Sequence, residues 1–359
     1  MSGSAAPAES QVRFRDLVVT LGGSAESYSG NFSAVTLPIV DSTEDATAAV
    51  GEVAVSGSLI LLGSRTRSFD VSFDGGMRQA AAFGFEELDY APREWVGSVS
   101  PRFIQGLGSW GSLRVRGLYR GRSVQDRPPM PLFLQPGYSM LQGVVGLITR
   151  SFDGLSFDAR VDVEETDYGA LALVPQLDLL DRRSSGVEVG LRWGATSTIR
   201  VHGGLRWTEY SNQGSFDPDD PFRRDRTARV GMEWTHSGHV FAQVGLDGAM
   251  NRSNSDRPEY DAVSFRALVT TPLPAGFSLN AYAVLTDKGY LHETDFARLV
   301  PGEEADNASI AYLQVGRSLA SNLDGAVRLG WTRAETDFGQ AYYERFGLSV
   351  HANYRPLTR

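Results

Sequence analysis

The chain has 359 residues, carries a formal net charge of -9 and contains no cysteine. The acidic balance gives no support to nucleic-acid binding, and the lack of cysteine excludes disulfides and thiolate metal sites. No apolar run approaches the roughly 18 residues that a membrane-spanning helix needs, so a helical membrane protein is excluded. Hydrophobic residues make up 42% of the chain, and glycine and aromatic residues are plentiful. This composition fits a β-barrel, in which half of each strand faces a polar lumen.

The first residues, MSGSAAPAES, contain neither a basic segment nor an apolar one. A secretory signal peptide is therefore not expected here, and in an exported protein it would already have been removed. We expect residues 1–10 to be a flexible tail, residues 11–355 to form a single transmembrane barrel, and residues 356–359 to be a C-terminal tail.

Short segments with alternating apolar residues recur along the whole chain, and each predicts a β-strand. In chain order the predicted strands cover residues 11–21, 53–61, 69–77, 95–103, 113–119, 141–147, 155–163, 187–193, 199–207, 228–234, 240–246, 263–269, 277–285, 311–315, 323–331 and 346–354.

The segment from Gly186 to Tyr210 shows the pattern most clearly. It contains two alternating stretches joined by a tight turn, and each apolar row ends in a tryptophan, Trp193 or Trp207. Each stretch is about nine or ten residues long, which is the length a tilted strand needs to cross a bilayer. Tryptophan collects where a membrane meets water. The segment therefore predicts a transmembrane β-hairpin.

The connections between the predicted strands alternate between short turns and long polar loops, as in outer-membrane barrels. The long loops are expected around residues 22–50, 84–94, 121–137, 165–185, 209–226, 251–261, 287–307 and 333–343. Tryptophans fall beside both kinds of connection, which predicts two membrane girdles. Trp110, Trp193 and Trp234 lie beside short turns, and Trp95, Trp207 and Trp331 lie beside long loops.

The predicted fold is all-β: a transmembrane antiparallel up-and-down barrel of about sixteen strands, within a range of 14–18. A periplasmic β-sandwich is the alternative. Alternation, loop asymmetry and the final aromatic-bearing stretch, FGLSVHANY, make the chain resemble the porin-like outer-membrane barrels of Gram-negative bacteria. The chain departs from them by continuing past Tyr354 with RPLTR and by lacking a PEFGG-like motif. The resemblance implies an outer-membrane location, contact with lipid and lipopolysaccharide, short periplasmic turns, and insertion by the barrel-assembly machinery.

If the apolar residues face lipid, the residues that alternate with them face the lumen. Rings of arginine select anions in other pores. Alternatively, arginines and acids pair across the lumen, stiffen the wall and set no selectivity. The predicted pore-lining residues are Arg114, Arg116, Arg120, Asp158, Arg160, Asp162, Glu188, Arg192, Arg200, Arg206, Arg229, Glu233, Arg266 and Arg328.

Two long loops are unusually apolar. The Pro-rich loop from Arg122 to Pro136 has an apolar tip, and the resemblance to porins implies a third long loop that folds inward and narrows the channel. The constriction candidates are Met130, Leu132, Phe133 and Leu134. Packing of this loop on the barrel rim is the alternative. The segment from Ala170 to Leu180 could form a short helix, a strand extension or a partner contact.

Other ligand chemistry has little support in the sequence. Acidic clusters in the long loops, such as residues 217–220, could bind calcium, but a solvated acidic rim is the simpler interpretation. His236 and His239 bracket a turn without a third zinc ligand. His202 and His351 would face the lumen with no evident serine partner and no orienting carboxylate. We predict no enzymatic activity, no metal and no cofactor.

The sequence best predicts an outer-membrane channel for passive diffusion of small anionic or sugar-like solutes. An alternative is a plugged barrel whose extracellular loops bind a partner protein or a surface polymer. A third is an export pore for a polysaccharide. A protein partner and self-association both remain open, and nucleic acid is not expected as a partner.

Overall fold

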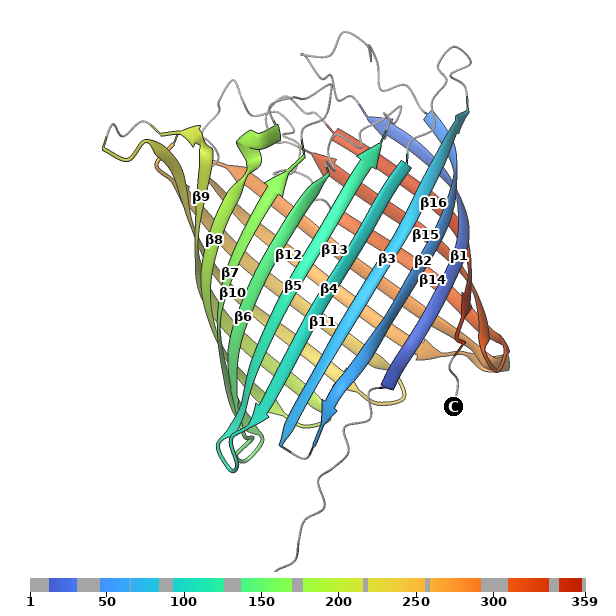
Figure 1. Ribbon diagram of the computed structural model, residues 1–359, viewed down its shortest axis with the longest axis horizontal. Helices are drawn as coiled ribbons and strands as arrows, with labels where there is room; N and C mark the ends of the chain where they lie inside the picture. The colour runs from blue at the N-terminus through green and yellow to red at the C-terminus, as the bar shows by residue number, and fades with distance from the viewer. Residues whose placement is uncertain are drawn as a thin grey trace, which may run out of the picture.

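The computed structural model describes residues 13–30, 46–64, 66–83, 93–125, 137–169, 177–215, 219–255, 259–291, 309–335 and 342–356. Sixteen β-strands form a closed barrel in which every strand is hydrogen-bonded to the strands before and after it in sequence (Figure 1). The first strand, β1 (Arg13–Gly30), closes the ring by antiparallel pairing with the last, β16 (Tyr342–Tyr354). The predicted antiparallel barrel of about sixteen strands is therefore confirmed.

The other strands follow in chain order, and the described residues between them include two short 3-10 helices. They are β2 (Ala46–Gly63), β3 (Arg67–Phe83), β4 (Arg93–Gly106), β5 (Gly111–Gln125), β6 (Tyr138–Thr149), β7 (Leu155–Tyr168), η2 (Leu177–Leu180), β8 (Arg182–Gly194), β9 (Ser197–Gly214), β10 (Phe222–Ser237), β11 (Phe241–Ser253), β12 (Tyr260–Pro272), η3 (Pro274–Gly276), β13 (Phe277–Tyr290), β14 (Ser309–Ala320) and β15 (Leu323–Glu335).

Closure of the sheet gives each of the described strands a hydrogen-bonded neighbour on both sides. The ladder between β1 and β16 runs from the Val19–Tyr354 pair to the Gly30–Tyr343 pair. A closed barrel satisfies its backbone hydrogen bonds between neighbouring strands, which allows a sheet to cross a bilayer. No helix in the described parts of the chain is both long enough and apolar enough to span a membrane.

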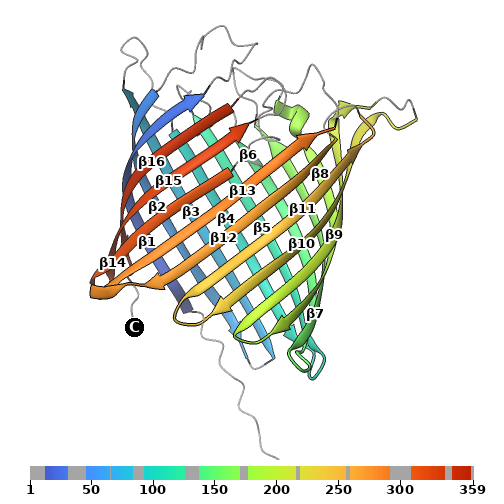
Figure 2. The same cartoon turned by 180° about the vertical axis from the view of Figure 1, so that it is seen from behind.

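The two ends of the barrel differ in their connections (Figures 1 and 2). At one end the strands are joined by short turns, the shortest being residues 195–196 and 321–322 and the longest residues 150–154. At the other end the connections are longer, up to residues 291–308. β1 begins and β16 ends at the short-turn end, in agreement with an even number of strands.

Several strands are longer than the sequence predicts. β1 is expected to end at Leu21 but continues to Gly30, and β9 continues past Trp207 to Gly214. The extension of β1, GGSAESYSG, lacks apolar alternation, yet β2 and β16 pair with it on both sides. A register shift between Arg15 and Val18 accounts for the irregular alternation at the start of β1. Asp16 lies within it at φ 54°, in the left-handed region.

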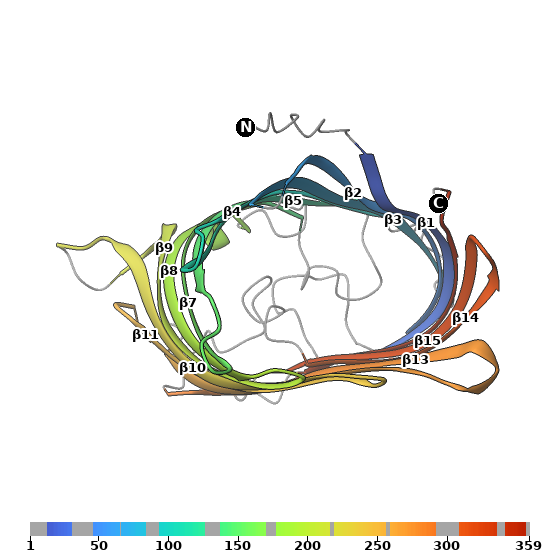
Figure 3. The same ribbon diagram turned by 90° about the horizontal axis from the view of Figure 1, so that it is seen from below.

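The barrel is oval in cross-section (Figure 3). β4 and β5 lie on one long side of the oval, and β13 lies on the other. β5 and β13 therefore lie on opposite sides of the shorter dimension of the lumen.

Candidate functional site

The outward face of the sheet carries an exposed apolar band. Leu191, Val201 and Met232 lie side by side on β8, β9 and β10, and all three are exposed. Apolar surface of this extent is rare on soluble monomers, whereas transmembrane barrels present such a band to lipid. A closed sixteen-stranded barrel with an apolar exterior belongs to the outer-membrane β-barrel class.

The tryptophans (6 in the chain) lie near both ends of this outer surface. Trp193 and Trp234 flank Ile199 near the short-turn end. Trp331, near the opposite end, donates its Nε1 hydrogen to Glu344 Oε1 at 2.6 Å. The remaining ones are Trp110 in a short turn, Trp95 on β4 and Trp207 on β9, all exposed. These positions match the predicted girdles, whose membrane role stays a prediction.

The alternate residues share the inner, concave face. Arg200 on β9 reaches across β8 to place Nη2 2.6 Å from Asp158 Oδ2 on β7. Side chains can meet in this way on a concave face because they converge there. Strand register puts the predicted pore-lining residues on this face; their function in a pore stays a prediction. They are Arg114, Arg116, Arg120, Asp158, Arg160, Asp162, Glu188, Arg192, Arg200, Arg206, Arg229, Glu233, Arg266 and Arg328.

Ion pairs connect many of the inner residues along the wall. Glu188 binds two arginines, with Oε1 2.8 Å from Arg200 Nη2 and Oε2 2.7 Å from Arg160 Nη2. Farther along the same strands, Arg206 Nη2 on β9 lies 2.7 Å from Asp162 Oδ2 on β7. These pairs join strands that are adjacent or next but one. They differ in this respect from the cross-lumen pairing that the sequence suggests as an alternative.

Inward-facing glycines make room for several of these contacts. Gly186 lies between Asp162 and Arg206 in the register, and a Cβ there would be 2.9 Å from Asp162 Oδ1. Gly231 lies in the same way between His202 and Asp247. A missing side chain on the middle strand thus lets residues of the two flanking strands meet. Sequence alternation alone does not reveal this arrangement, because it requires the register of three strands.

A second charged cluster on β1 to β5 is missing from the sequence-based site. Arg78 Nη2 lies 2.5 Å from Glu26 Oε1, and Arg78 also approaches Glu52 and Glu94 at 3.6 and 3.9 Å. Arg122 Nε lies 2.9 Å from Glu94 Oε1. Inward parity of these residues on successive strands is the signal that could have identified the cluster.

Other inner arginines have no such partner and are named here the free arginines. They make no hydrogen bond or ion pair with any residue that the structure describes, and each is exposed to solvent. Glu233 is an inward acid that likewise lacks an arginine partner among the described residues. The positive charge of the free arginines is therefore only partly offset. The free arginines are Arg114, Arg116 and Arg120 on β5, Arg192 on β8 and Arg229 on β10.

The structure describes only part of the two apolar loop segments that the sequence analysis identifies. Met130, Leu132, Phe133 and Leu134 lie outside the described residues, so their role in a constriction stays a prediction.

Of the segment from Ala170 to Leu180, residues 177–180 form the short helix η2, which contacts β7 and β9. Leu180 is only 4% exposed. Asp181, just after η2, accepts a hydrogen bond from the Tyr168 backbone N–H at 2.7 Å, while burial raises the pKa of its carboxyl above the ordinary value. This part of the loop packs on the barrel rim.

The histidines require one correction. His202 does have an orienting carboxylate, because its Nε2 lies 2.9 Å from Asp247 Oδ1. Its Nδ1 is buried and makes no hydrogen bond with the part of the chain that the structure describes. Within the described ranges, no group of three or more histidine, aspartate or glutamate side chains could hold a metal ion. Most of the acidic loop residues named as calcium candidates lie outside those ranges.

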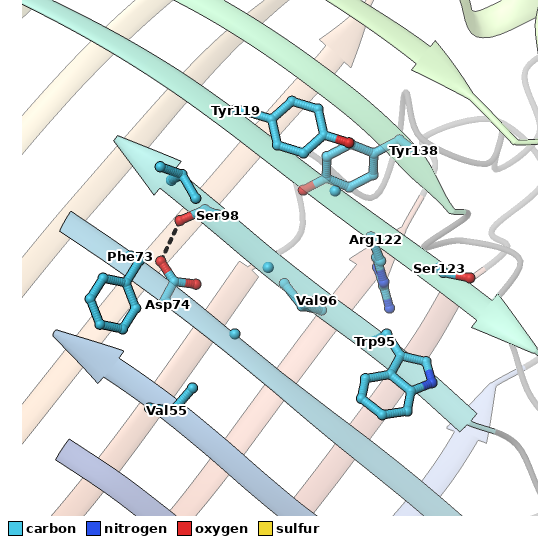
Figure 4. A pocket seen from close by; sticks show the side chains of 14 residues that line it. Val55, Phe73, Asp74, Trp95, Val96, Ser98, Tyr119, Arg122, Ser123 and Tyr138 are labelled. Carbon is cyan, nitrogen blue, oxygen red and sulfur yellow. Dashed lines mark hydrogen bonds between the residues drawn. The ribbon is translucent and has the colours of Figure 1, made fainter. Parts of the chain in front are cut away.

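A groove of about 560 Å³ lies in the wall formed by β2 to β6 (Figure 4). Its lining includes the outward side chains of Phe73, Trp95 and Tyr119. Gly97 pairs with Gly75 on one side and Gly121 on the other, which leaves the outer surface hollow between these aromatic rings. The groove therefore opens on the outer surface, and none of the free arginines lines it.

Comparison with known proteins gives no family. No protein-family model and no curated protein matches the chain. Among solved structures, the TodX deltaS2S3 mutant monoaromatic hydrocarbon channel is 9% identical with a TM-score of 0.44, and the match covers 94% of this chain and 90% of that one.

Two solved structures of Pseudomonas aeruginosa proteins are similar to the same degree. OccD3 (OpdP) is 10% identical with a TM-score of 0.43, and the match covers 95% of this chain and 92% of that one. OccK2 (OpdF), solved in complex with glucuronate, is 10% identical with a TM-score of 0.43, and the match covers 95% of this chain and 99% of that one.

Proposed function

We propose that the protein is an outer-membrane channel through which small anionic solutes diffuse passively. The free arginines on the concave face of the barrel carry this proposal. A barrel of sixteen strands is wide enough to enclose water. Arginine stays protonated at physiological pH, and cationic rings favour anions in other pores.

The paired and the free charges have different roles in this mechanism. The pairs of Arg160, Arg200 and Arg206 with acids hold the wall rigid and contribute no net charge. The free arginines supply the potential that draws an anion inward. Salt screens that potential over about 8 Å at physiological ionic strength. The anion preference is therefore expected to weaken as the salt concentration rises.

The channel function implies that the barrel is embedded in the outer membrane. The apolar band would be covered by outer-membrane lipid and lipopolysaccharide, the long connections would face the exterior, and the barrel-assembly machinery would insert the chain. The loop that follows β5, residues 126–136, would fold inward and limit the size of solutes.

Single-channel recording in a planar lipid bilayer tests the channel function. We expect stable conductance of the nanosiemens order with an anion preference in the reversal potential. A protein that inserts with a β-rich circular dichroism spectrum but stays electrically silent would contradict the channel. That result would favour an interaction barrel whose outer loops bind a partner protein or a surface polymer.

A further inference from the structure

The inner wall opposite β5 has a different chemistry from the arginine-lined side. Tyr282 on β13 and Tyr312 on β14 are inward-facing register partners. Their rings stack with centroids 5.2 Å apart and planes inclined by 29°. The pair forms an aromatic surface on the wall of the lumen.

Aliphatic residues extend this aromatic surface. Leu268 is the register partner of Tyr282 on β12, and Val284 pairs with Ile310 between β13 and β14. Ile310 is 40% exposed although it points inward. Leaving apolar surface in contact with water is unfavourable, at roughly 25 cal/mol per Å². A solute with an apolar face would gain by covering it. We call these five residues the aromatic strip.

A cation lies at the edge of the aromatic strip. Arg328 on β15 donates from Nε and Nη2 to Gln314 Oε1 at 2.8 and 2.6 Å. Its guanidinium carbon is 4.8 Å from the centroid of the Tyr312 ring. Arg328 has no carboxylate partner among the described residues. Three of its five N–H groups are not used by Gln314 and could bind an anion.

The wall beside Tyr312 is open. The next inward positions in the same register row are Gly330 on β15 and Gly347 on β16. A Cβ built on Gly330 would have a single neighbour within 4 Å, the backbone oxygen of Gly347 at 3.9 Å. These two glycines leave space on the inner wall beside the stacked tyrosines and close to Arg328.

We propose that this wall is a binding site for carboxylates carried on a planar apolar ring, with benzoate as the simplest example. This inference deepens the channel function and rests on it. The ring would lie against the aromatic strip, and the carboxylate would bind the open N–H groups of Arg328. A sugar acid fits less well, because Leu268, Val284 and Ile310 offer its hydroxyl groups no hydrogen bond. Chloride would gain nothing from the strip.

Binding of benzoate to the purified, folded barrel in detergent micelles tests the site, measured by isothermal titration calorimetry. This readout does not require an open channel. We expect the double variant Tyr282→Leu/Tyr312→Leu, which keeps the apolar volume, to weaken binding about fivefold to tenfold. Arg328→Gln removes the charged hydrogen bonds and should weaken it about tenfold or more.

Matched controls identify the site. Val144→Ala changes an inward aliphatic residue on β6, outside the aromatic strip, and should leave benzoate affinity unchanged. Arg120→Gln removes a free arginine on the other wall and should alter ion selectivity without altering benzoate affinity. Glucuronate, with the same charge on a hydroxylated ring, should bind at least about tenfold more weakly than benzoate.

The outcomes separate this site from the channel function. Absence of benzoate binding in a conducting protein would overturn the site and leave the channel standing. Benzoate binding in a silent protein would support the site and overturn the channel. Tighter binding of glucuronate than of benzoate would overturn the assigned ligand class. Equal affinities in the wild type, the tyrosine double variant and Arg328→Gln would overturn the location.

Discussion

His202 Nε2 and Asp247 Oδ1 lie 2.9 Å apart, although β10 separates the strands that carry them. Gly231 on β10 pairs with both residues and has no side chain to keep them apart. A Cβ there would lie 2.6 Å from His202 Cε1. The inner wall therefore depends on glycine as well as on charge.

This relationship can be tested with a double-mutant cycle of His202→Leu and Asp247→Asn. We expect a coupling free energy of about 1 kcal/mol in the wild-type background, as for an ordinary hydrogen bond. In the Gly231→Ala background the coupling should disappear, because the new methyl group separates the two side chains. The measurement is the free energy of unfolding by urea in detergent.

The control for this cycle is Gly245→Ala, an inward glycine on the neighbouring strand β11. A Cβ there would come no closer than 3.7 Å to another atom, the Met232 backbone oxygen. The coupling should survive in this background. Equal coupling in the Gly231→Ala and Gly245→Ala backgrounds would contradict the role assigned to Gly231.

Arg223 and Arg224 are adjacent but should contribute very differently to stability. Arg223 is 1% exposed, pairs with Asp225 at 2.6 Å and lies over the ring of Tyr210. Arg223→Ala leaves the buried Asp225 without its cation and should lower the free energy of unfolding by about 3 kcal/mol or more.

Arg224→Ala is the matched control on the opposite face. Its pairs with Glu209 and Asp220 are half-exposed. Water and salt screen exposed ion pairs, so Arg224→Ala should lower the unfolding free energy far less than Arg223→Ala does. Chemical denaturation of both variants in detergent measures the difference. Similar losses of unfolding free energy in the two variants would contradict the prediction that the buried ion pair of Arg223 contributes more than the exposed pairs of Arg224.

Adjacent residues on β8 test the assignment of the two faces. Trp193 points outward and Arg192 points inward. Trp193→Asp puts a charge on the lipid-facing surface and should lower the yield of refolding into lipid vesicles. Arg192→Asp introduces the same residue on the lumen side and should leave the yield near that of the wild type. The yield is read from protease resistance or gel mobility. Equal yields for the two variants would contradict the assignment of Trp193 to the lipid-facing surface and of Arg192 to the lumen.

The sequence predicts the barrel well because one physical rule repeats in every strand. Alternation of residues such as Val187 and Glu188 fixes which side chains point inward, whichever strand is the neighbour. The positions at which strands end are predicted less accurately. The small and polar residues of GGSAESYSG carry no alternation, and only the partners on β2 and β16 make them a strand.

The contacts within the lumen could not be predicted from one sequence. Asp158 and Arg200 are far apart in the chain, and they meet only because Gly190 lies between them on β8. Their pairing depends on two registers, neither of which has a local signal. The same applies to Tyr282 and Tyr312, whose inward parity is readable but whose stacking requires the pairing of β13 with β14.

The reversal potential under a salt gradient, compared between two double variants, decides between an arginine-selective pore and an electrically neutral wall. Arg116→Gln/Arg120→Gln removes two free arginines. Arg160→Gln/Glu188→Gln removes one charge of each sign from a paired site. We predict an anion-selective wild type, a clear shift toward cations in the first variant and little change in the second. A non-selective wild type, or equal shifts in both variants, would contradict an anion channel governed by its free arginines.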